Sequence, residues 1–246
     1  MIKDSFIFGV HPILEALQNG EEVDKILIQS GLRNDHLQNI IRLAKKQDIY
    51  IQYVPIDKLN RQTRKNHQGI IAMMSLVEYQ KIENLLPLIY EKGETPFILV
   101  LDRITDIRNI GAIARTAECT GVQAILVPAQ NSAKINGEAV KSSAGAILRV
   151  PIARSFNLKE DLVLLKESGL QIIGVSEKTE TNYTKNDYKL PTALIMGSEE
   201  DGVSEEYLKL CDSFAKIPMV GEIASLNVSA AAAVVLYEAL NQKLNP

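Results

Sequence analysis

Short runs of nearly continuous apolar residues recur between longer helical segments in the second part of the chain. Strands that are apolar on both faces occur where helices cover both sides of a parallel sheet. We expect the last helix from about Leu226 to Gln242, because Ala230–Ala233 lie inside this segment and alanine is the best helix former. The pattern predicts a parallel α/β domain over residues 96–246. The strand-like runs are Phe97–Leu101, Val122–Val127, Ile147–Pro151, Gln171–Val175, Ala193–Met196 and Phe214–Ile217.

The first 75 residues show a different alternation of strands and helices, which predicts a small α/β domain over residues 1–75. Asn34 is the expected N-cap of the second helix of this domain. Residues 76–95 are rich in charge and contain a short apolar segment, so they predict a linker with one short helix. The expected strands are Ser5–Phe8, Lys25–Gln29, Tyr50–Val54 and Gly69–Met74, and the expected helices are His11–Gln18, Asn34–Lys46 and Ile56–Arg61.

Composition narrows the function classes. The net charge is −3, but residues 1–75 carry ten Lys and Arg against eight Asp and Glu, and the remainder carries seventeen against twenty-two. This mild asymmetry permits a basic face on the front domain. No run reaches the roughly 18 apolar residues of a membrane span, and the first four residues show no secretory signal pattern. Cys119 and Cys211 are too few for a disulfide framework and lack metal-ligand spacing. We therefore expect a cytoplasmic protein without a metal site or membrane association.

The common nucleotide and hydrolase motifs are absent from the sequence. No two glycines are separated by a single residue and no Gly-Lys pair occurs, so there is neither a dinucleotide fingerprint nor a P-loop. The three histidines are far apart in the sequence, and no nucleophile elbow precedes them. Phosphate-cradling loops and triad hydrolysis are therefore not expected.

Three polar segments follow predicted strands in the second domain, at residues 101–117, 194–204 and 217–230. In the first, a strand ends at Asp102, a helix begins near Asn109, and Arg115 lies about two turns further on. Taken singly, each segment has an ordinary structural explanation: a surface arginine, a loop between a strand and a helix, and a group of helix-capping side chains.

Taken together, in this order and spacing, the three segments resemble the signature motifs of the SpoU family of RNA 2′-O-methyltransferases in the SPOUT superfamily. The front domain resembles the family's L30e-like substrate-binding domain, on the evidence of residues 8–17 and 67–70. The resemblance implies a trefoil-knotted catalytic domain, S-adenosylmethionine as cofactor, RNA as substrate and a homodimer. One position departs from the family pattern, because Ile107 stands where the family often has a proline that would stiffen the loop.

The resemblance also implies roles for individual residues. Arg115 is expected nearest the reacting hydroxyl, with Asn109 orienting either the 2′-oxygen or Arg115. Glu199 is expected to tether the loop by pairing with an arginine. Ser225 and Asn227 are expected to shape the floor of the pocket. Residues expected at the adenosyl group are Gly197, Ile217, Leu226, Met219 and Val175, and residues expected at RNA are Arg61, Arg64, Lys65 and His67.

The resemblance favours a guanosine of large-subunit ribosomal RNA as the methylated nucleotide. Two alternatives remain open at this point. One keeps the chemistry and changes the substrate to transfer RNA. The other is a non-catalytic RNA-binding protein, against which the intact set of Asn109, Arg115, Glu199 and Asn227 argues.

Overall fold

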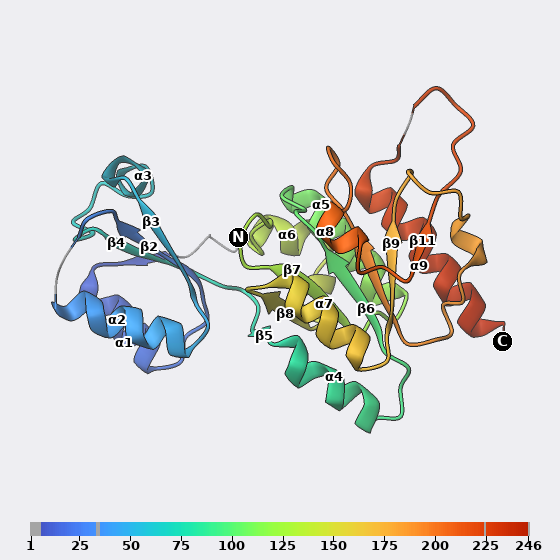
Figure 1. The fold of residues 1–246 in the computed structure, drawn as a ribbon. Helices are drawn as coiled ribbons and strands as arrows, with labels where there is room; N and C mark the ends of the chain where they lie inside the picture. Colours follow the sequence, from blue (N-terminus) through green and yellow to red (C-terminus); the bar gives the residue numbers. More distant parts are fainter. Residues whose placement is uncertain (1–5, 33–34, 224, 246) are drawn as a thin grey trace. The chain divides into compact units, whose positions relative to one another are not determined.

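The computed structural model describes residues 6–32, 35–223 and 225–245 (Figure 1). The chain divides into two compact units, residues 1–78 and residues 79–246. Each unit has its own sheet and its own buried core.

The first unit is a four-stranded sheet in the order β1-β4-β2-β3 with helices on both faces. Strand β4 is antiparallel to β1 and β2, while β2 and β3 are parallel. Alternate residues of β2 enter opposite cores: Ile26 and Ile28 pack with helices α1 and α2, and Leu27 packs on the other side with α3. The expected cap Asn34 lies outside the described residues. The elements are β1 (Phe6–Phe8), α1 (Val10–Gln18), β2 (Val23–Gln29), α2 (Asp35–Lys46), β3 (Tyr50–Val54), α3 (Ile56–Asn60) and β4 (Ile70–Met74).

The second unit is built on a seven-stranded sheet in the order β11-β9-β10-β6-β7-β8-β5, and every pairing in it is parallel. The central strands β6 and β10 are buried along their whole length, as their apolar sequences predict. The strands are β5 (Tyr79–Gln80), β6 (Phe97–Leu101), β7 (Ala124–Pro128), β8 (Ile152–Ser155), β9 (Gln171–Val175), β10 (Thr192–Met196) and β11 (Ser213–Ala215).

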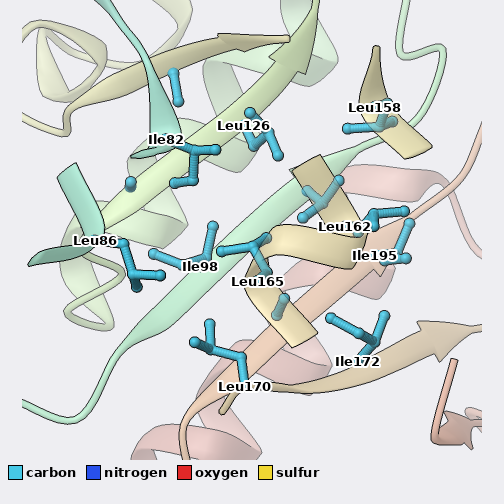
Figure 2. Packing of buried hydrophobic residues seen from close by; sticks show 14 of the residues in the cluster. Ile82, Leu86, Ile98, Leu126, Leu158, Leu162, Leu165, Leu170, Ile172 and Ile195 are labelled. Carbon is cyan, nitrogen blue, oxygen red and sulfur yellow. The ribbon is translucent and has the colours of Figure 1, made fainter. Parts of the chain in front are cut away.

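Helices cover both faces of this sheet. On one face, α4 and α7 supply the leucines and isoleucines of a core that includes Ile98, Leu126 and Ile195 from the strands (Figure 2). On the other face α5 packs against α6 and α9 (Figure 1). None of the helices within residues 6–32, 35–223 and 225–245 is long and apolar enough to cross a membrane. The helices are α4 (Ile82–Glu91), α5 (Ile107–Cys119), α6 (Gly137–Ser142), α7 (Leu158–Glu167), α8 (Glu205–Leu208) and α9 (Val228–Leu244), with 3-10 turns η1 (Ala146–Leu148) and η2 (Tyr183–Lys185).

Two expectations differ from the structure. The strand expected at Ile147–Pro151 is wrong: Gly145 adopts a left-handed conformation with φ 85°, the next three residues form η1, and the strand begins only at Ile152. The interval expected as a linker also differs, because most of it belongs to the second unit. Strand β5 pairs with β8, and the apolar face of α4 lies in the core of Figure 2.

Candidate active site

The carboxyl ends of the four adjacent strands β11, β9, β10 and β6 meet at one edge of the sheet, where parallel α/β domains generally bind ligands. A cavity of about 300 Å³, called here the first cavity, opens at this edge. Its walls come from the ends of β9, β10 and β11 and from the start of α9. The lining residues are Val175, Ser176, Glu177, Met196, Gly197, Ser198, Glu199, Glu200, Gly202, Ala215, Ile217, Met219, Ser225, Leu226, Val228 and Ala231.

The structure brings all five residues expected at the cofactor to this one cavity, although they come from three separate segments of the chain. Ser225, expected on the pocket floor, lines it as well. Ser176, Glu177 and Ala231 also line the cavity and were not predicted as site residues. The first two directly follow β9, so their position after a buried strand was the available signal.

Gly197 makes possible the tight loop after β10. The loop folds back on itself through paired backbone hydrogen bonds between Ser198 and Gly202, 3.0 and 3.1 Å long. A Cβ atom at Gly197 would lie 2.0 Å from the backbone of Gly202 and Val203. The glycine is therefore required by close backbone approach.

Three motif side chains form one hydrogen-bonded cluster, and one of them, Glu199, lines the first cavity. The Asn109 amide donates to Glu199 Oε1 over 2.9 Å, and the Asn227 amide donates both to that oxygen and to Asn109 Oδ1. Asn227 is also the N-cap of α9, where its Oδ1 accepts from the backbone N–H of Ser229. The cluster thus joins the start of α5, the loop after β10 and the start of α9.

The expected arginine partner of Glu199 is not among its contacts in the described part of the chain. Its partners are the two asparagine amides, which satisfy one carboxylate oxygen and leave the other without a protein partner among the described residues. Arg115 lies elsewhere. Its side chain is exposed on α5 and does not line the first cavity.

A second cluster fixes the same loop from β6. The carboxylate of Asp102 is buried and accepts hydrogen bonds from the backbone N–H and hydroxyl of Ser204, over 2.8 and 2.6 Å. Arg103 pairs with Asp102 and with Asp201, and it also donates to the carbonyl of Gly202. Burial alone would lower the pKa of Arg103, but hydrogen bonds and charge from the two aspartates outweigh it and raise the pKa.

A second cavity, of about 330 Å³, adjoins the first. The two share Ser198, Glu199, Glu200 and Val228 as a common wall. The other lining residues come from the loop before α5, from the first turn of α5, from Asn131 and from the loop after β10. They are Arg103, Ile104, Thr105, Asp106, Asn109, Asn131 and Asp201.

The residues expected at RNA in the first unit fall into two groups. Arg61, Arg64 and Lys65 are exposed. His67 is buried, and both of its ring nitrogens are engaged: the Gly69 N–H donates to Nδ1, so Nε2 carries the proton and donates to Asn60. His67 therefore holds the loop in place, and its contact with RNA stays a prediction.

Comparison with known proteins identifies the family to which each unit belongs. Residues 96–237 match the model of the SpoU rRNA Methylase family, and residues 6–80 match that of the RNA 2′-O ribose methyltransferase substrate-binding domain. The chain is 35% identical over 98% of its length to YacO of Bacillus subtilis, named as a TrmH family tRNA/rRNA methyltransferase, covering 96% of that protein. Staphylococcus aureus relatives with the same family name are also 35% identical, over 98% of both chains.

Solved structures agree. The SpoU methyltransferase AviRb from Streptomyces viridochromogenes, crystallised with AdoMet, matches 98% of this chain and 91% of its own, with TM-score 0.62 and 26% identity. A TrmH/SpoU tRNA modifying enzyme of A. aeolicus matches 66% of this chain and 84% of its own, with TM-score 0.57 and 32% identity. The chain therefore belongs to the SpoU family, and it is an RNA 2′-O-ribose methyltransferase of the SpoU/TrmH type.

Proposed function

We propose that this chain methylates a ribose 2′-hydroxyl of RNA with S-adenosylmethionine held in the first cavity. The observation that carries the proposal is the convergence of two motif segments, 194–204 and 217–230, and the end of β9 on that cavity. The remaining motif segment joins them through the hydrogen bond from Asn109 to Glu199, which lines the cavity. The lining fits the cofactor: apolar Val175, Ile217 and Leu226 suit an adenosyl group, and the carboxylates of Glu177 and Glu199 suit its cationic sulfonium. AviRb, with AdoMet bound, supplies a precedent on the same fold.

When bound, S-adenosylmethionine supplies a methyl group on a positively charged sulfur. The protein's task is to place the ribose 2′-oxygen in line with the carbon–sulfur bond and to exclude water. The 2′-oxygen forms the new bond as that bond breaks, and the hydroxyl proton passes to water or to an RNA phosphate. A guanidinium stays protonated at neutral pH. Arg115 therefore acts by stabilising the developing negative charge on oxygen.

Arg115 reaches such a site from a second copy of the chain. Asn109 and Arg115 are six residues apart on α5, which places their side chains roughly 120° apart around the helix axis. One chain therefore directs the two side chains to different sides of α5, and only Asn109 lines the second cavity. Exposed apolar side chains beside the first cavity support a homodimer, notably Val220 and Ile223, which are 101% and 78% exposed. We also propose that the second unit carries the trefoil knot of the family.

Mixing two inactive variants tests this arrangement. Arg115→Lys keeps the charge and loses the planar fork, and Asn227→Ala removes the amide that donates to Asn109 and Glu199. If each site takes Arg115 from the other chain, mixed dimers contain one intact site and activity returns. If mixtures that light scattering shows to be dimers, with twice the chain mass of 27.2 kDa, stay inactive, Arg115 does not act across the interface.

We propose large-subunit ribosomal RNA as the substrate, with a guanosine as the target. The front unit supports a large RNA, because it matches a dedicated substrate-binding domain and presents exposed cations. Transfer RNA is the second candidate, favoured by the name of the A. aeolicus structure, which matches only 66% of this chain. Arg61, Arg64 and Lys65 would anchor phosphates, which sets position more than sequence.

The decisive assay uses methyl-labelled S-adenosylmethionine and RNA from cells that lack this protein. The expected result is label in ribosomal RNA. Alkali should not cleave the RNA chain next to the labelled ribose, because its 2′-oxygen is methylated. Label in transfer RNA alone would change the substrate and leave the chemistry intact, and no label in either would overturn the proposal.

The triple change of Arg61, Arg64 and Lys65 to Ala should flatten the salt dependence of RNA binding, by about one unit of slope or less per phosphate contact. Changing Lys45 and Lys46, on α2, is the charge control.

A further inference from the structure

The second cavity is placed to receive the nucleotide that is methylated. It shares a wall with the first cavity, so two ligands bound in them meet at Ser198, Glu199 and Val228. A volume of about 330 Å³ lies in the range of small-molecule sites. Glu199 keeps one carboxylate oxygen free of protein partners among the described residues, and this oxygen is available to a ribose hydroxyl at the wall.

The charges of the second cavity decide which part of a nucleotide it holds. Among the described residues, Arg103 is the single cation in its lining, and the guanidinium is already engaged by Asp102, Asp201 and the Gly202 carbonyl. The other charged side chains of that lining are acids. A phosphate would meet net repulsion there, so the cavity suits the uncharged nucleoside and leaves the phosphates outside.

Glu200 supplies the feature that distinguishes one base from another. It lines the second cavity, is exposed, and has no hydrogen-bond or ion-pair partner among the described residues. A carboxylate accepts two hydrogen bonds side by side and donates none. Thr105 and Asn131, in the same lining, carry donor groups as well.

We propose that the second cavity binds the target nucleobase and that Glu200 selects guanine, an inference that rests on the proposed methyltransferase function. On the Watson–Crick edge, guanine alone presents two adjacent donors, N1–H and the N2 amine, which match a carboxylate. Its O6 accepts from Thr105 or Asn131. Adenine, cytosine and uracil each place at least one acceptor lone pair opposite a carboxylate oxygen, which repels them. RNA enzymes read splayed-out bases on this edge.

The first test identifies the methylated nucleoside, and it works before the position of that nucleoside in the RNA is mapped. RNA from cells lacking the protein is methylated by the full-length enzyme with labelled cofactor and digested to nucleosides. 2′-O-Methylguanosine is the expected product. Label in any other 2′-O-methylnucleoside overturns the guanine assignment while the methyltransferase function stands. Absence of all label overturns the methyltransferase function itself.

The second test assigns the recognition to Glu200. A synthetic RNA spanning the mapped site is made with guanosine or with inosine, which lacks the N2 amine. The parent enzyme should lose about ten- to hundredfold in kcat/KM on inosine, the size typical of one bidentate base contact. Glu200→Gln should lose a similar factor on guanosine and little more on inosine. Glu205→Gln, at the start of α8 and outside both cavities, is the charge-matched control and should match the parent.

Two results would contradict the assignment. A parent enzyme that methylates inosine and guanosine equally well shows that the N2 amine is not read. If the loss caused by Glu200→Gln and the loss caused by inosine multiply independently, the Glu200 carboxylate and the N2 amine do not contact each other. Because Glu200 also lines the first cavity, cofactor affinity is measured for each variant, and an unchanged value confines the effect to the RNA.

Discussion

Replacing Gly197 with alanine should weaken cofactor binding on the order of a hundredfold. The new Cβ would lie 2.0 Å from the Gly202 carbonyl carbon and the Val203 nitrogen, whereas ordinary contact begins at 3.4 Å. Both neighbours are backbone atoms, so the two sides of the loop must separate by more than 1 Å. Overpacking of this kind costs about 1–3 kcal/mol of stability. A misplacement of about 1 Å also costs on the order of a hundredfold in a preorganised site.

Calorimetry with S-adenosylmethionine and urea unfolding measure the two effects separately. The control is Gly121→Ala, which stands in open space at φ 73° after α5. It should lose roughly 1–2 kcal/mol from left-handed strain and keep its cofactor affinity. If Gly197→Ala binds the cofactor within threefold of the parent, the loop does not depend on this close approach and the reasoning fails.

Three further predictions concern the packing of the second unit. Gly111→Ala should destabilise the pair α5 and α6, because a Cβ there would meet the Ser142 hydroxyl, and adding Ser142→Gly should restore part of the loss in thermal unfolding. Ser204→Ala removes a hydroxyl hydrogen bond to a buried carboxylate and should cost about 1.5–3 kcal/mol in urea unfolding; an unchanged midpoint would contradict that bond. Burial raises the pKa of the Cys211 thiol to about 11, so a thiol reagent at pH 8 should modify exposed Cys119 alone until the protein unfolds. As the folded pKa lies above the unfolded value of 9.0, this thiol's contribution to stability is complete below pH 9 and is lost as the pH rises toward 11.

The sheet of the second unit could be predicted from the sequence because burial on both faces leaves a continuous apolar signature. Strands β6, β9 and β10 coincide with predicted runs to within one residue. The run Ile147–Pro151 failed because apolar character does not distinguish a strand from a buried turn. A left-handed Gly145 and local i to i+3 hydrogen bonds decide the matter there.

The short helix in the predicted linker shows a different limit. Its apolar residues Ile82, Leu85, Leu86 and Ile89 follow helical spacing, and this pattern predicts a helix with one buried face. Spacing does not say what covers that face. The covering surface is the sheet and α7, formed by residues far along the chain.

The site was predictable only through its motifs. Asn109 and Glu199 are 90 residues apart, and they meet because β6 and β10 are neighbours in the sheet. No periodicity encodes that adjacency. The Asp102 and Arg103 cluster could not be predicted either, because Arg103 adopts φ 58°, a conformation that non-glycine residues rarely take.

Ile107, which stands where the family often has proline, is accommodated by the cap that precedes it. Proline at the first helical position fixes φ before the helix forms. Here Asp106 fixes the start of the helix instead, because its carboxylate accepts hydrogen bonds from the backbone N–H groups of Arg108 and Asn109 over 2.6 and 3.2 Å. The cap therefore sets where α5 begins, and with it the position of Asn109.

Asn227 performs two tasks with two different atoms, and substitution can separate them. Its Oδ1 caps α9, while its Nδ2 donates to Glu199 and Asn109. Serine caps a helix about as well as asparagine, whereas alanine costs roughly 1 kcal/mol, and neither keeps the amide donor. Asn227→Ser should therefore unfold at the parental urea concentration and still lose methyl transfer on the order of a hundredfold, the effect expected when a reacting group is misplaced by about 1 Å. Asn227→Ala should lose both stability and activity. A serine variant that methylates RNA at the parental rate would show that the amide bonds to Glu199 and Asn109 do not hold the site together.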